Sequence, residues 1–186
     1  MRTVGPRLAA GLFAASLLVS GCGGNPEPQP LPKPTVSPSP SASASATPPV
    51  MPSAAKAKTK AGAIEFARYY VELINHAQAT GDTVALAGLE SPECKTCARS
   101  RKGIERLYES GAVVRGGDWS IGGISAIRNP ATDGWLVELA VRFGPQFIDR
   151  PGSADDQDLK GGRLPVNLQL EWRDSSWQVG ESTRGA

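Results

Sequence analysis

Three cysteines and a single histidine are the residues of this chain whose chemistry depends most on their surroundings. Cys94 and Cys97 have the CxxC spacing, which proteins use for short disulfides, for thiol-disulfide exchange and, in pairs of motifs, for zinc. His76 would be a general base if it were aimed into a site. Cys22 stands apart near the N-terminus, where a different chemistry is expected.

Cys22 closes a segment with the pattern of an exported lipoprotein. Two arginines precede an apolar stretch over residues 8–19, which is too short to span a bilayer but suits a signal peptide. The small-residue lipobox then consists of Val19, Ser20 and Gly21. We expect cleavage before Cys22 and diacylglycerol on its thiol, whose two chains would hold the protein firmly at the outer face of the cell membrane. A conventional signal peptide cut nearby, or an uncut anchor, is the alternative.

An extracytoplasmic location leaves Cys94 and Cys97 as an even pair in an oxidising environment. We therefore expect a disulfide between them that pins the start of a helix. A redox-active pair is the alternative, because a helix N-terminus lowers the pKa of a thiol. Metal binding is not expected, because no second CxxC or nearby histidine pair completes a set of four ligands.

No set of side chains with catalytic spacing stands out. His76 falls opposite the apolar face of an expected helix, so we interpret it as a solvated residue. A serine triad is not indicated, because there is no Gly-x-Ser-x-Gly elbow. We expect no catalytic residue, no metal and no cofactor.

Carboxylates remain the candidates for acid-base or metal chemistry. A pocket isomerase would need one that faces inward, and those considered are Asp118, Glu138, Asp149 and Glu171. Strand parity places Glu138 and Glu171 away from the apolar side. A calcium site is the alternative for Asp155, Asp156 and Asp158, but they lack its full ligand register, so we interpret them as part of a mobile loop. The four tryptophans are interpreted mainly as core residues.

The charge balance excludes a nucleic-acid binder. The chain has 20 Lys and Arg against 18 Asp and Glu, and loss of the signal peptide would remove two arginines. A polyanion-binding protein needs a clear excess of positive charge. One modest basic cluster is interleaved with Glu105 and Glu109 and is interpreted as a solvated helix face: Arg99, Arg101, Lys102 and Arg106.

Composition divides the chain into three parts. Residues 1–21 are the expected signal peptide, residues 22–55 the lipidated Cys22 with a linker rich in Pro, Ser and Ala, and residues 56–186 a single domain. The linker has too few large apolar side chains to offset the entropy of ordering it. We interpret it as a spacer, with a proline-motif ligand or a glycosylated stalk as alternatives.

Three helices open the expected domain. Apolar residues recur at helical spacing in the first of them, at Ala63, Phe66, Ala67, Tyr70, Ile74 and Ala77. Gly81 is placed to end this helix, and Asp82 to cap a short second helix through Leu86. Ser91 and Pro92 suit the start of a third, which would end near Ser110.

Beyond Gly111 the apolar period changes to alternation, which is typical of half-buried strands. One strand is expected over residues 135–143 and another over residues 164–173, with Gly122 and Gly123 forming a bulge in an earlier strand. The expected fold class is α+β, with three N-terminal helices packed on a curved antiparallel sheet of about four strands.

This order of elements, with the stretch AGAIEFARYYVELINHAQATGDTVALAGL, resembles the nuclear transport factor 2-like (cystatin-like) fold, a cone of helices on a bent sheet. From residue 49 through SPECKTC to GGDW, the chain is also similar to an uncharacterised family of actinobacterial lipoproteins, domain of unknown function family 6318. The resemblance implies an architecture and a location but no activity, because this fold serves isomerases, dehydratases, transport factors and adaptors alike.

The sequence thus favours a membrane-anchored, extracytoplasmic binding or adaptor domain without catalytic activity. Its expected partners are the membrane, through diacylglyceryl Cys22, and either a cell-envelope protein or a small apolar ligand. The alternatives are a small-molecule pocket enzyme of the isomerase or dehydratase type and a CxxC thiol-disulfide oxidoreductase. A cavity holding a buried carboxylate would favour chemistry.

Overall fold

The computed structural model describes residues 47–152 and 157–185. The predicted signal peptide, the lipobox, Cys22 and most of the linker lie outside the described residues, as do Asp155 and Asp156. In the described ranges, no helix is both long and apolar enough to cross a membrane.

Four helical segments come first in the described residues, and their ends follow local chemistry. They are η1 (Ser53–Lys56), α1 (Lys60–Thr80), α2 (Val84–Ala87) and α3 (Lys95–Glu109). The hydroxyl of Thr59 caps α1 by accepting from the Gly62 amide at 3.0 Å. As predicted, Gly81 ends α1 in the left-handed conformation, with φ of 79°. The Asp82 carboxylate accepts from the Val84 amide at 3.0 Å and so supports the start of α2.

The predicted start of the third helix at Ser91 and Pro92 is wrong. The Ser91 amide instead donates to the Val179 carbonyl at 3.0 Å, which holds this segment beside a strand. A turn follows, and α3 begins at Lys95 after the cap Cys94, whose sulfur accepts from the Cys97 amide at 3.3 Å. Pairing with the sheet therefore overrides the local helix-start signal.

Seven strands follow the helices in the ranges that the structure describes. They are β1 (Val113–Gly116), β2 (Trp119–Asn129), β3 (Gly134–Phe143), β4 (Gln146–Asp149), β5 (Gln157–Leu159), β6 (Gly162–Arg173) and β7 (Ser176–Arg184). An antiparallel sheet has the order β2-β3-β6-β7, and a smaller antiparallel sheet has the order β1-β4-β5. The α+β class with three α-helices is confirmed.

The prediction of a single sheet is wrong, because the strands form two sheets. The hydrogen-bonded strand pairing is interrupted between β3 and β4 and again between β5 and β6. Gly144 and Pro145 separate the first two strands, and Lys160 and Gly161 separate the other two. A side chain at Gly161 would place its Cβ 2.7 Å from the Phe143 carbonyl oxygen, so the chains approach closely here. The predicted bulge is confirmed by a register shift between Ile121 and Gly123.

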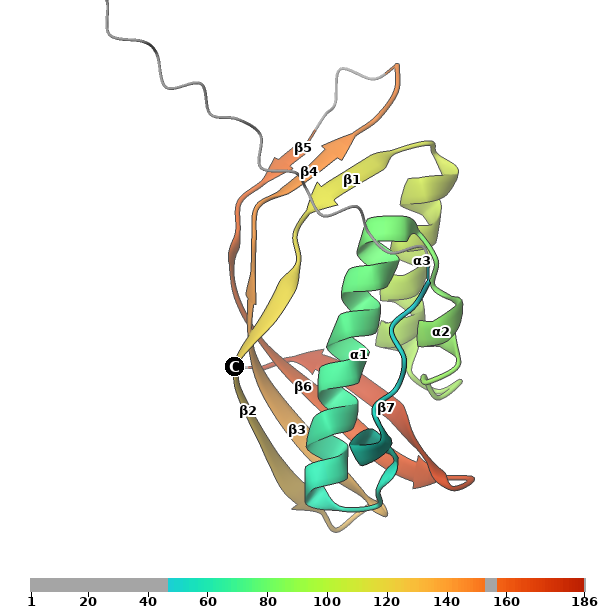
Figure 1. The fold of residues 1–186 in the computed structure, drawn as a ribbon, viewed down its shortest axis with the longest axis vertical. Coiled ribbons are helices and arrows are strands. Elements are labelled where there is room, and N and C mark those ends of the chain that lie inside the picture. The colour runs from blue at the N-terminus through green and yellow to red at the C-terminus, as the bar shows by residue number, and fades with distance from the viewer. Residues whose placement is uncertain (1–46, 153–156, 186) are drawn as a thin grey trace, which may run out of the picture. The chain divides into compact units, whose positions relative to one another are not determined.

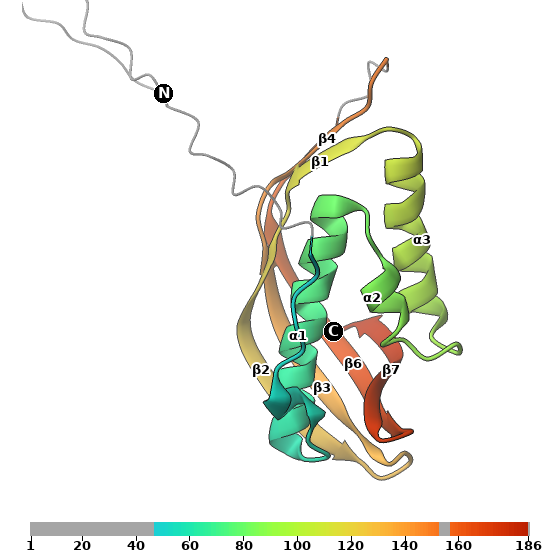
Figure 2. The same ribbon diagram turned by 45° about the vertical axis from the view of Figure 1, so that its right-hand side comes forward.

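The helices form layers on one face of the larger sheet. Figures 1 and 2 show α1 lying along the inner face of the bent sheet, with α2 and α3 beyond it. Contacts join α1 to β2 and β3, and α3 to β7. The core lies between α1 and the sheet, and its largest fully buried side chains include Phe66, Leu73, Leu168 and Leu170.

The residues before α1 also belong to the packed structure, so packing starts ahead of the predicted domain start at Lys56. We call residues 47–59 the N-terminal strap. It runs back along α1 in the opposite direction, since the Tyr69 hydroxyl donates to the Pro49 carbonyl at 3.2 Å (Figure 1). Ala55 is fully buried in the core, and the Trp177 indole donates to the Ala57 carbonyl at 3.0 Å.

Candidate functional site

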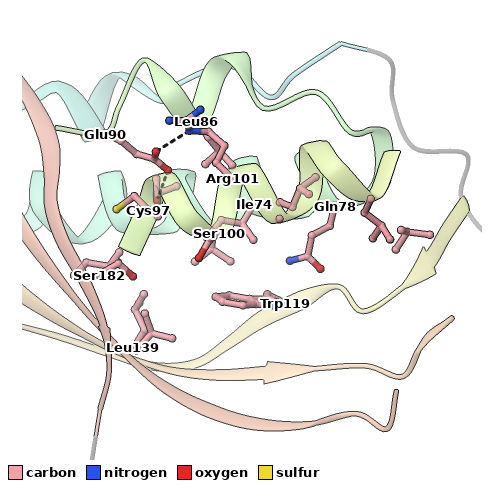
Figure 3. A pocket seen from close by; sticks show the side chains of 18 of the residues that line it. Ile74, Gln78, Leu86, Glu90, Cys97, Ser100, Arg101, Trp119, Leu139 and Ser182 are labelled. Atoms are coloured by element: carbon pink, nitrogen blue, oxygen red, sulfur yellow. Dashed lines mark hydrogen bonds and ion pairs between the residues drawn. The ribbon is translucent and has the colours of Figure 1, made fainter. Parts of the chain in front are cut away.

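A cavity of about 320 Å³ lies between α1, α3 and the sheet. Aliphatic and aromatic side chains form most of its wall, among them Val71, Ile74, Leu86, Ile104, Leu107, Trp119, Leu139 and Leu168. Figure 3 shows Trp119 and Leu139 on the sheet side and Ile74 on the helical side. This volume falls at the lower end of the range of about 300–1,000 Å³ that small-molecule sites occupy.

A network of polar side chains stands at one end of this cavity. The Arg101 Nε donates to the Glu90 carboxylate at 2.9 Å, and the Tyr70 hydroxyl donates to its other oxygen at 2.9 Å (Figure 3). A further guanidinium nitrogen of Arg101 lies 3.3 Å from the Glu105 carboxylate. Only 5% of the Glu90 side chain is exposed, against 22% for Arg101.

The network shifts the proton equilibria of two of its members. Burial raises the pKa of Tyr70 well above its ordinary range, and the nearby negative charge of Glu90 raises it further. The hydrogen bond to Glu90 raises the pKa of Arg101. Tyr70 therefore stays a neutral hydrogen-bond donor and Arg101 stays a cation at any physiological pH.

Three elements hold these side chains together. Tyr70 lies in α1 and Arg101 in α3, whereas Glu90 lies in the connection between α2 and α3. The Glu90 backbone forms a parallel bridge with Val179 of β7, and the Val179 amide donates to the Leu89 carbonyl at 2.8 Å. The sheet thus fixes the carboxylate, and the two helices supply its partners.

Amide side chains mark the other end of the cavity. Gln78 is eight residues after Tyr70 in α1, which separates the two ends by about 12 Å. Its side-chain oxygen accepts from the Gln146 amide group at 3.1 Å, and its carbonyl accepts from the Tyr108 hydroxyl at 2.6 Å. Between the ends, Asn75 holds the Trp119 backbone through two hydrogen bonds, so this part of the wall is rigid.

The predicted disulfide is present between Cys94 and Cys97, whose Cα atoms are 5.3 Å apart. It closes the N-terminal turn of α3, and Cys97 precedes Arg101 by four residues, which is about one helical turn. Cys94 and Cys97 are 2% and 3% exposed, and Cys97 contributes to the cavity wall. Attack by another thiol needs access to a sulfur, so this burial suits a structural disulfide.

The prediction that His76 is solvated is wrong. Its side chain is 6% exposed, and its Nε2 has no hydrogen-bond partner among the described residues, the nearest carboxylate being Asp82 at 3.8 Å. The cause is that α1 is covered on more than one side, because the chain reverses at Gly81 and α2 returns beside it. His76 does not line the cavity.

None of the four carboxylates considered from the sequence lines the cavity. Glu138 faces away from the core, as parity predicts, and accepts from Ser125 at 3.0 Å. Glu171 pairs with Arg173 at 2.7 Å. Asp158 is exposed in β5, and within the described ranges no three metal-binding side chains gather into a site.

One other interpretation needs correction, that of the basic cluster on α3. Arg99, Lys102 and Arg106 are exposed as expected of a solvated helix face, but Arg101 turns inward to Glu90. The assignment of the tryptophans mainly to the core is confirmed: Trp177 is buried with Trp172 packed edge-on at 4.8 Å, and Trp119 and Trp135 also pack against the core, Trp119 in addition lining the cavity. The inward position of Arg101 had a signal in the sequence, because it shares a helix face with Cys97 and Tyr108.

A family of unknown function, DUF6318, matches residues 38–183. The chain belongs to the DUF6318 family. The expected membership is thus confirmed, and the described helices on a bent antiparallel sheet agree with the expected nuclear transport factor 2-like arrangement. No curated protein matches this DUF6318 chain in sequence.

Two solved structures are similar to this DUF6318 protein at low identity. The intermembrane space region of the chloroplast protein ARC6 is 13% identical, with a TM-score of 0.49, over 66% of this chain and 96% of that one. A substituted form of Rd1NTF2_05 is 12% identical, with a TM-score of 0.41, over 65% of this chain and 97% of that one. Neither likeness carries a function over to the DUF6318 chain.

Proposed function

We propose that this protein is a membrane-anchored, extracytoplasmic lipoprotein whose domain binds a small, mainly apolar ligand without catalysing a reaction. The anchor would be diacylglyceryl Cys22, as the lipobox pattern indicates. The observation that carries the binding role is the cavity of about 320 Å³ between α1, α3 and the sheet. Its wall is mostly apolar, so binding would be driven by burial of apolar surface.

The buried carboxylate that lines this cavity is the observation in favour of an enzyme. Glu90 would be its acid or base, as in a pocket isomerase. Against this, both of its carboxylate oxygens already accept hydrogen bonds, from Tyr70 and from Arg101. A carboxylate held in this way serves better as a fixed structural ion than as a group that exchanges protons with a ligand.

The alternative of a CxxC oxidoreductase has less support. Both cysteines are almost fully buried in the disulfide form, so a second protein cannot reach either sulfur without rearrangement of α3. A disulfide that fixes the N-terminal end of α3 also has a structural role, because α3 forms one wall of the cavity.

Ligand binding is tested with N-phenylnaphthylamine, a neutral apolar fluorophore whose emission rises when it leaves water. We expect the purified domain, residues 47–186 with the disulfide intact, to bind it saturably. Ile104→Trp places a large ring in the cavity and should weaken this binding at least about tenfold, because the space is lost. Fluorescence titration gives both affinities.

Val113→Trp is the matched control, because it adds the same ring to a residue that is 47% exposed and does not line the cavity. It should leave binding unchanged. Thermal melting of both variants verifies that they fold. Equal affinities for the wild type and a folded Ile104→Trp would contradict the proposal, as would absence of saturable binding.

A further inference from the structure

The charges at the polar end of the cavity belong to a closed group. One cation, Arg101, lies between two carboxylates, Glu90 at 2.9 Å and Glu105 at 3.3 Å. Thr83 donates to the same Glu105 oxygen at 2.6 Å, and Tyr70 donates to Glu90. Among these groups the acidic charges exceed the basic ones by one.

An anionic ligand group has no place in this arrangement. The positive charge of Arg101 is already directed at Glu90, whose side chain is 5% exposed, and at Glu105, whose side chain is 33% exposed. A carboxylate or phosphate at this end would lose its water and meet the like charge of Glu90 in the cavity wall, while Arg101, the only cation among the described residues of that wall, is already paired with Glu90 and with Glu105 outside the wall. An ammonium group would also lose its water, and it would have to lie beside the guanidinium.

Neutral hydrogen-bonding groups are available at the same end. Ser182 of β7 and Ser100 of α3 line the cavity, Ser100 as an exposed residue next to Arg101 in the chain, and in the view of Figure 3 both lie on the side away from Gln78. In the part of the chain that the structure describes, neither hydroxyl has a hydrogen-bond partner. Such hydroxyls both donate and accept, so they match an alcohol or an amide.

We infer that the cavity takes an uncharged amphiphile, with a hydroxyl or amide head near Ser100, Ser182 and Arg101 and an apolar body that extends past Trp119 toward Gln78. This inference rests on the proposed function and gives the chemical class of its ligand. The clustered carboxylates exclude fatty acids and other lipids with an anionic head. The apolar wall supplies the affinity, and the polar end selects by charge.

The experiment compares three ligands with the same chain of carbon atoms and different heads: dodecanol, dodecylamine and dodecanoate. Each ligand is titrated to displace N-phenylnaphthylamine from the purified domain at pH 7.5. The concentration of each ligand stays below its solubility limit and, for the two charged ligands, below the micelle concentration. We expect dodecanol to bind at least about tenfold more tightly than dodecanoate, with dodecylamine also weaker than dodecanol. Equal or tighter binding of either charged ligand would overturn the inference.

Variants connect the selectivity to the network. Glu90→Gln keeps the side-chain shape but leaves Arg101 with one carboxylate fewer, so dodecanoate should bind at least about tenfold more tightly than it does to the wild type. Glu105→Gln should also tighten the binding of dodecanoate, and it replaces Glu90→Gln in the experiment if Glu90→Gln unfolds at a much lower temperature than the wild type. Glu109→Gln makes the same charge change at an exposed site on α3 that forms no ion pair with Arg101 in the described part of the chain and does not line the cavity, so it should leave the binding of all three ligands unchanged.

The outcomes separate the two proposals. If the wild type binds the fluorophore and all three ligands alike, with no effect of either network variant, the cavity binds apolar molecules but the inferred ligand class is wrong. If the wild type binds neither the fluorophore nor any of the three ligands, the proposed function fails, and the inference fails with it.

Discussion

Tyr70 gives the polar network a measurable dependence on pH. Burial, and then the charge of Glu90, raise the pKa of its hydroxyl well above the ordinary value. The folded protein therefore holds this proton at a pH where the unfolded chain has begun to lose it. The resulting stability is complete below the ordinary tyrosine pKa of about 10 and is lost as the pH rises through the higher folded value.

We expect Tyr70→Phe to remove this dependence. The free energy of unfolding of the wild type should fall between about pH 9.5 and pH 11, and that of Tyr70→Phe should fall less steeply. Tyr69→Phe is the control, because the pKa of Tyr69 is raised less and its hydroxyl bonds the Pro49 carbonyl outside the network. Urea unfolding at a series of pH values measures the slopes. Parallel curves for the wild type and Tyr70→Phe would contradict this assignment.

The two partners of the central ion pair differ in how far the sequence reveals them. Arg101 follows Cys97 by one helical turn and precedes Tyr108 by two, so helical spacing alone places it on the inward face. Glu90 has no such signal. Its burial depends on a bridge to Val179, which is 89 residues further along the chain, and no local pattern encodes that contact.

The helix ends were the most predictable feature of the elements, because a glycine with positive φ is a local requirement. Gly81 after α1 and Gly111 after α3 both have it, with φ of 79° and 78°. Their surroundings differ. A Cβ on Gly81 would lie 2.6 Å from the ring of Tyr108, whereas a Cβ on Gly111 would meet no atom within 4 Å.

This difference predicts unequal costs for the same substitution. Gly111→Ala should lower the free energy of unfolding by about 1 kcal/mol, from backbone strain alone. Gly81→Ala adds a clash with Tyr108, and should cost about 3 kcal/mol. Chemical denaturation of the two variants gives the comparison. Equal losses would mean that Tyr108 yields to the added methyl group without cost.

The strands were predictable only where they are long. Alternation reveals β3 and β6, because each has one face on the core and one in solvent. The strands β1, β4 and β5 have four residues or fewer, so alternation has too few positions to count. Their pairing also depends on the direction in which the chain turns at Gly144 and Pro145, and this direction cannot be predicted from the sequence.

At the scale of the whole molecule, the prediction that matters most concerns Cys22. With an alkyne-labelled fatty acid supplied to growing cells, the wild-type protein should take up the label and fractionate with membranes. Cys22→Ala should take up none and retain its leader, because the thiol is the proposed site of attachment. In-gel fluorescence and the mass of the purified protein check both points.

Cys94→Ala serves as the control for this experiment. It also removes a cysteine, but one that the structure places in a buried disulfide, so labelling and fractionation should persist. A wild-type protein found unlabelled in the cytosol with its leader intact would refute the proposed location, and would leave the cavity without its extracytoplasmic setting.

The N-terminal strap has a mechanical consequence if the protein is anchored through Cys22 as we propose. Tension on the anchor would load the contacts of the strap, among them the bond between the Pro49 carbonyl and the Tyr69 hydroxyl. Further along the strap, the next contacts are the burial of Ala55 and the hydrogen bond from the Trp177 indole to the Ala57 carbonyl. A pulling force would thus peel the strap from α1 step by step before it reached the sheet or the cavity, which would keep their shape under load.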